Sequence, residues 1–265
     1  MTTATATPAD TTPPTDARHR VAVPSLARLT GVELRKLVDT RAGRWLLITI
    51  GLIAVAIAVV QLFVLDDDQQ TFQSFFDPSL LPISLLLPVL GILSITAEWS
   101  QRTALTTFTL TPRRGRVILA KLGAVLLAAL ASVLVSLAVA AVFTLLARAT
   151  GGAGGWDLEW ASVLHAAVFQ IASVLMGAGF GLLLLNTPLA IVTYLLLPTV
   201  WTILGGLIKA LREPARWLDT SSTMQPLMTS EVTAEQWGRL AVSLLVWVAV
   251  PLAAGLWRTL RREVS

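Results

Sequence analysis

The chain alternates between six long apolar stretches and shorter polar segments. An apolar helix needs about 20 residues to cross the hydrocarbon core of a bilayer, and each stretch reaches or approaches that length. The pattern therefore predicts an all-α integral membrane protein with six transmembrane helices. The predicted spans are 45–65, 79–97, 117–147, 161–185, 187–208 and 238–257.

Two connections after the fourth span are informative. The fourth and fifth spans are separated only by Asn186, Thr187 and Pro188. A single helix through both would exceed any bilayer and would place Pro188 in its interior, so we expect a tight turn. Segment 209–237 is too polar to cross, and its scattered apolar residues predict a short amphipathic structure on the outer face.

Composition agrees with a membrane protein. The 265 residues are 55% hydrophobic and only 14% charged, and the mean hydropathy is +0.73. Soluble domains carry about 25% charged residues. The absence of cysteine excludes disulfides, thiol catalysis and cysteine-ligated metals. The basic residues flank the apolar spans instead of forming a patch with interleaved aromatics, so we expect no nucleic acid partner.

The distribution of charge predicts the orientation. With both termini cytoplasmic, 15 of the 20 Lys and Arg residues lie on the inner side and five on the outer side, as the positive-inside rule requires. Asp66, Asp67, Asp68 and Asp77 then all fall in the first outer loop.

The N-terminal region divides into two parts. Residues 1–24 are rich in Thr, Pro and Ala and predict a disordered cytoplasmic tail. Residues 25–44 predict an amphipathic helix lying along the inner leaflet; the alternative is a solvated helix next to the membrane. Its apolar side is formed by Leu26, Leu29, Leu34, Leu37 and Val38. Its other positions hold Arg28, Glu33, Arg35, Lys36 and Asp39.

Charge, proline and threonine are concentrated between the second and third spans. Glu98 ends the second span, and Lys121 lies near the beginning of the third. A carboxylate at membrane depth is costly unless it is paired, so we expect Lys121 or Arg102 to pair with Glu98. The long stem of Lys121 also predicts that its amine reaches the interface.

The leader and this loop together resemble the membrane subunit of a type-2 ATP-binding-cassette (ABC) exporter. In that family a Glu ends the second span, a Gly/Arg-Thr pair follows, and a Pro-x-x-Arg-type turn leads to a Lys that opens the third span. The resemblance covers the chain from about residue 25, so 25–265 would form one permease domain. The residues that carry it are Glu33, Leu34, Arg35 and Leu37 in the leader, and Glu98, Arg102, Thr103, Pro112, Arg113 and Lys121 in the loop.

The resemblance implies a permease subunit of the plasma membrane that pairs with a second permease copy, identical or not, and with a cytoplasmic ABC ATPase. It implies no enzyme site and no cofactor in this chain, since ATP and Mg would be bound by the ATPase. The loop would be a coupling helix, with Leu105 and Phe108 as apolar knobs at i, i+3 and its arginines near acidic residues or headgroups. Arg113, Arg114 and Arg116 can equally be ordinary positive-inside anchors.

Other features limit the alternatives. No Gly-x-x-x-x-Gly-Lys-Ser/Thr motif occurs, so the chain cannot cradle ATP itself. An intramembrane glutamate protease would need a second Glu beside Glu98, where residue 97 is Ala. Gly177 and Gly181 predict close helix packing, within one subunit or across a dimer. The few uncharged polar residues of the later spans favour an amphipathic drug or a lipid-like cargo. An ATP-independent transporter or channel, or a membrane scaffold or sensor, is the alternative function.

Overall fold

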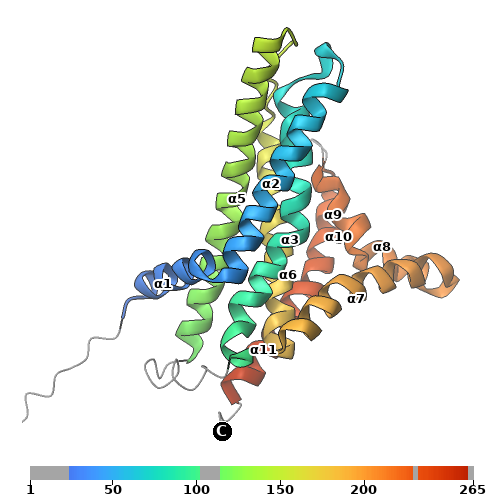
Figure 1. Cartoon of the computed structure of the whole chain (residues 1–265). Helices are drawn as coiled ribbons and strands as arrows, with labels where there is room; N and C mark the ends of the chain where they lie inside the picture. The colour runs from blue at the N-terminus through green and yellow to red at the C-terminus, as the bar shows by residue number, and fades with distance from the viewer. Residues whose placement is uncertain (1–23, 102–113, 229–231, 262–265) are drawn as a thin grey trace, which may run out of the picture.

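The computed structural model describes residues 24–101, 114–228 and 232–261, and within these ranges the chain is helical, without a β-strand. Six helices are long and apolar enough to cross a membrane, which confirms the six predicted spans (Figure 1). The last of them is composite, because a π-helical segment lies between its two α-helical parts. The spans are α2 (Arg41–Val64), α3 (Phe72–Ser100), α5 (Arg114–Thr150), α6 (Trp160–Leu184), α7 (Thr187–Leu207), and α10 (Ala234–Leu244) with η4 (Leu245–Ala249) and α11 (Val250–Arg261).

Helix α3 begins at Phe72 and not at the predicted position 79. Asp77, which was predicted to lie in a loop, therefore lies within the helix. Pro78 has no N–H to donate to the carbonyl of Ser74, but the Gln61 side-chain amide donates to that oxygen at 2.7 Å. A contact from α2 thus compensates for the proline, and the helix continues through it.

The centre of the bundle is the packing of α3 against α6. A Cβ added at Gly177 would lie 2.5 Å from the carbonyl oxygen of Pro88, and one at Gly181 would lie 3.3 Å from the Cβ of Ile95. Both glycines therefore allow the backbones of α6 and α3 to approach closely. The predicted Gly-x-x-x-Gly contact is confirmed as packing within one chain.

The predicted tight turn after α6 is also confirmed. Leu185 adopts a left-handed conformation with φ 50°, and the Asn186 side chain accepts from the Leu189 N–H at 3.0 Å to cap α7. Helix α7 then leaves the bundle obliquely, and short helices return the chain toward it (Figure 1). These are η2 (Lys209–Leu211), α8 (Arg212–Leu218), α9 (Thr220–Met224) and η3 (Gln225–Met228).

Candidate functional site: an ion-paired junction of three helices

Helix α1 (Leu26–Asp39) lies crosswise against the long helices (Figure 1). Thr40 alone connects it to α2, and its hydroxyl caps α2 by accepting from the Gly43 N–H at 3.2 Å. A Cβ at Gly43 would lie only 1.9 Å from the carbonyl oxygen of Leu37. The sharp corner between α1 and α2 therefore requires glycine at position 43.

The face of α1 that contacts the bundle carries Thr30, Glu33 and Leu37, which are one or two helical turns apart. Thr30 lies against α5, where a Cβ at Gly123 would come within 3.2 Å of its hydroxyl oxygen. Glu33 and Leu37 are each only 5% exposed. This small-residue contact brings α1 close enough for Glu33 to reach the interior of the bundle.

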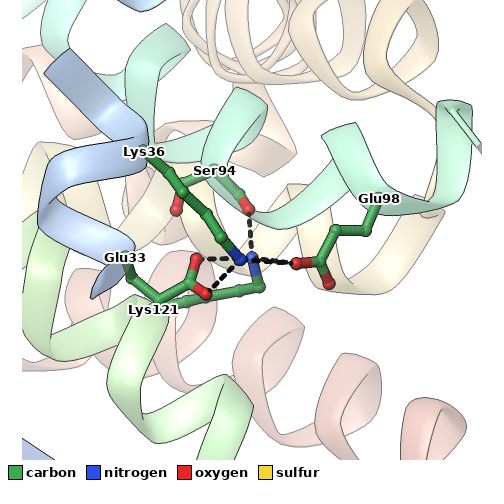
Figure 2. Close-up of polar contacts among 5 residues, drawn as sticks. All are labelled: Glu33, Lys36, Ser94, Glu98 and Lys121. Atoms are coloured by element: carbon green, nitrogen blue, oxygen red, sulfur yellow. Dashed lines mark hydrogen bonds and ion pairs between the residues drawn. The ribbon is translucent and has the colours of Figure 1, made fainter. Parts of the chain in front are cut away.

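Glu33, Lys36, Glu98 and Lys121 form one network, which we call the junction (Figure 2). Lys121 Nζ lies 2.8 Å from Glu33 Oε2, 3.1 Å from Glu98 Oε1 and 3.0 Å from the Ser94 carbonyl oxygen. Lys36 Nζ lies 2.6 Å from Glu33 Oε1 and 3.2 Å from Glu98 Oε1. The three donors of Lys121 each have an acceptor, and two carboxylates balance two ammonium groups.

The junction is buried to different depths. The side chains of Lys121 and Glu33 are 6% and 7% exposed, whereas that of Lys36 is 47% exposed. Burial lowers the pKa of Lys36, but the hydrogen bond and charge of Glu33, together with Glu98, outweigh this and raise the pKa above its usual 10.5. Lys36 therefore stays charged at neutral pH. Removing one partner of a buried ion pair costs about 3–5 kcal/mol, because the other charge is left without compensation.

The predicted pairing of Glu98 with Lys121 is confirmed. Two other expectations are wrong. Lys121 points into the protein and is not extended to the interface, because two carboxylates and a carbonyl surround its amine there. Glu33 is buried and does not lie with the polar positions of α1, whereas Leu26 and Val38 are 42% and 50% exposed.

Sequence reasoning missed that Glu33 and Lys36 belong to the same site as Glu98. The available signal was their i, i+3 spacing, with Leu37 one turn after Glu33. Of the other leader residues, Leu34 packs against the core and Arg35 is exposed. The remaining predicted loop residues lie outside the described ranges: Arg102, Thr103, Leu105, Phe108, Pro112 and Arg113.

The last turns of α3 also contact α7. Thr187 Oγ1, at the start of α7, lies 2.7 Å from Thr96 Oγ1 and 3.0 Å from Ser100 Oγ. A cavity of about 460 Å³ lies between this end of α3 and the corner of α1 and α2, and Lys36, Glu98 and Thr187 are among the residues that line it. One end of α3 is therefore bonded to α1, α5 and α7 together.

The junction is a set of ion pairs between side chains of three helices, α1, α3 and α5. No group of three or more His, Asp or Glu residues in the described part of the chain could hold a metal ion. The charges at the junction neutralise one another and fix the relative positions of three helices. No protein family model matches the chain, and no curated protein has a similar sequence.

Proposed function

We propose that this chain is the permease subunit of an ABC exporter in the plasma membrane, and that it moves an amphipathic drug or lipid-like cargo outward. A separate cytoplasmic ATPase would supply the energy, and a second permease copy would complete the pathway. The observation that carries the proposal is the junction. It ties the end of α3 and the beginning of α5, which flank the 102–113 segment, to α1.

A permease without its own nucleotide site needs a mechanical input. If the ATPase pushes the 102–113 segment, the force reaches α3 and α5 at their ends. Glu98 and Lys121 hold these two ends together at 3.1 Å, and the contact of Thr187 with Thr96 extends the connection to α7. Packed helices joined in this way shift as a rigid unit, which is a common form of switching transition.

The exposed surface of α1 supports an orientation with the junction on the cytoplasmic side. Leu26, Val32 and Val38 are between 42% and 50% exposed, and Arg28 and Arg35 are exposed as well. Apolar side chains of this kind can enter the acyl boundary while arginines contact anionic headgroups. We therefore place α1 in the inner leaflet.

The orientation can be tested with single cysteines, since the chain has none. One substitution is Thr106→Cys, in the 102–113 segment between α3 and α5, and the other is Thr150→Cys, at the opposite end of α5. A membrane-impermeant maleimide should label the first variant only from the cytoplasmic side and the second only from outside. The reverse labelling pattern would contradict the proposal.

The coupling role can be tested by affinity purification and transport. The tagged chain should bring an ATPase with it from native membranes. Glu98→Ala should insert normally and keep ATP hydrolysis but lose transport, whereas Glu213→Ala, which removes an exposed carboxylate from α8, should transport normally. Undiminished transport by Glu98→Ala would remove the role of the junction, and full transport without any ATPase would remove the proposed function.

A further inference from the structure

A second cavity lies away from the junction. It has a volume of about 590 Å³ and lies between α3, α6, α7 and the short helices α9 and η3, in the region where α7 departs from the bundle (Figure 1). Small-molecule sites in proteins typically measure about 300–1,000 Å³. The volume is therefore sufficient for a ligand of the size of a drug or a lipid fragment.

The apolar lining of this cavity is adaptable. The chain has four methionines, and the three that follow Met1 all line this cavity: Met176, Met224 and Met228. Methionine has an unbranched, polarizable side chain that fits irregular shapes, and it is over-used at binding surfaces that accept different partners. Such a lining can contact apolar groups of more than one shape.

The polar lining is uncharged. The single tyrosine of the chain, Tyr194, contributes to it, together with Ser173, Thr199 and Gln225. The Tyr194 hydroxyl has no hydrogen-bond partner among the residues that the structure describes. A hydroxyl in an apolar wall is unfavourable without a partner, so a ligand that bonds to it would gain affinity.

Two of the lining residues have helix carbonyls that lack their usual donors. Pro88 cannot donate to the carbonyl of Ser84 in α3, and Pro198 cannot donate to that of Tyr194 in α7. Ser84 and Tyr194 both line the cavity. No side chain of the described residues donates to either oxygen, in contrast to Ser74, whose carbonyl accepts from Gln61.

We propose that this cavity binds an uncharged amphiphile whose polar end donates a hydrogen bond, such as a hydroxyl or an amide N–H, and whose apolar body varies in shape. Carbonyl and hydroxyl acceptors would bind the polar end, and the methionines would contact the body. Entry is from the bilayer, because the lining residues Leu85, Leu195 and Met228 are 40–58% exposed. Its use as a cargo site rests on the transport function proposed above, but binding by the chain alone does not.

The test uses the full chain in phosphatidylcholine vesicles without an ATPase. The probe is a long-chain alcohol that carries a diazirine, and labelled peptides are located by mass spectrometry in the presence of increasing unlabelled alcohol. We expect saturable labelling of α6, α7 and α9. Tyr194→Phe should raise the alcohol concentration that gives half-maximal labelling about fivefold, because one hydrogen bond contributes about 1 kcal/mol.

Two adjacent positions of α7 provide a matched pair of larger changes. Thr199 lines the cavity and Val200 does not, and both are exposed, so tryptophan at either position should leave the fold intact. Thr199→Trp should lower labelling at least about tenfold, as expected when a site is filled and more than about 1.4 kcal/mol of affinity is lost. Val200→Trp should leave labelling unchanged.

Equal labelling of the Thr199→Trp and Val200→Trp variants would overturn the proposal. So would labelling that does not saturate and spreads over the lipid-facing surfaces of α2 and α7. An alkylammonium probe that labels the same peptides equally well would refute the requirement for an uncharged ligand. If binding behaves as expected but the bound alcohol is never transported, only the cargo role fails.

Discussion

The junction and the methionine-lined cavity lie on the same helix but are built on opposite principles. At the junction, Glu98 and the Ser94 carbonyl accept from Lys121 in a network of balanced charges. At the cavity, Ser84 and Leu85 lie among uncharged groups, and the Tyr194 hydroxyl is left without a partner among the described residues. Helix α3 thus has a fixed end and an adaptable middle.

The difference follows from what burial costs. Charges in a low-dielectric interior persist only when each has an opposite charge and hydrogen bonds, so the junction tolerates little change. Exchanging a flexible apolar side chain for another of similar volume costs little folding stability. Mutations at the junction should therefore cost more folding stability than mutations at the cavity, which should act mainly on binding.

The largest effect is expected for Lys121→Met. It keeps the length of the side chain but removes the buried ammonium group that pairs with both Glu33 and Glu98, which should cost about 3–5 kcal/mol of folding stability. The midpoint of thermal unfolding in detergent should fall steeply. Lys209→Met, at an exposed position, is the control, and equal midpoints for the two variants would show that the junction does not stabilise the fold.

Gly177→Ala tests the packing that holds α3 against α6 behind the cavity. The new Cβ would lie 2.5 Å from the carbonyl oxygen of Pro88, so the helices must separate, at a cost of about 1–3 kcal/mol. Gly51→Ala adds a methyl group within α2 where no atom lies within 4 Å. The unfolding midpoint should drop for Gly177→Ala alone, because alanine has a higher helix propensity than glycine and does not destabilise a helix where space is free. An undiminished midpoint for Gly177→Ala would mean that close packing does not require glycine at this position.

A smaller loss is expected for Thr187→Val, which keeps the shape but removes the hydroxyl shared with Thr96 and Ser100. Interhelical hydrogen bonds in membranes average about 0.6 kcal/mol. A double-mutant cycle with Thr96→Val should give a coupling energy of that order. Additive effects of the two substitutions would mean that α3 and α7 are not connected through this contact.

The sequence predicted the parts of this picture that depend on local pattern. Apolar length located all six spans, and the cost of a buried carboxylate identified Lys121 as a partner of Glu98. It could not place Glu33. Glu33 lies one turn after Leu29 and one turn before Leu37, so its helical position allows burial, but its buried partner Lys121 is 88 positions away in the chain.

Two further features depend on contacts that no local pattern reports. Helix α3 begins before Pro78 because Gln61, on another helix, supplies the missing donor for Ser74. The oblique course of α7 (Figure 1) leaves the 590 Å³ cavity beside it, yet its hydropathy resembles that of the other spans. Hydrophobicity indicates that a helix enters a membrane, whereas its direction is set by what it packs against.

Little effect on stability, and the sharpest contrast in binding between the two regions, is expected from reciprocal exchanges of methionine and leucine. Met176→Leu changes the cavity lining, and Leu90→Met changes a buried position that packs in the core beside α5. Both conserve volume and should alter stability by less than about 1.5 kcal/mol.

Only Met176→Leu should affect binding, because a branched side chain replaces one that adapts to the ligand. Alcohols of increasing bulk can be used as competitors of the diazirine probe in phosphatidylcholine vesicles. The affinities of these alcohols should differ more from one another for Met176→Leu than for the unmodified chain. Leu90→Met should leave that series unchanged. If the two variants give the same series, the methionines do not determine which ligands are accepted, and the cavity owes its tolerance to its opening toward the bilayer.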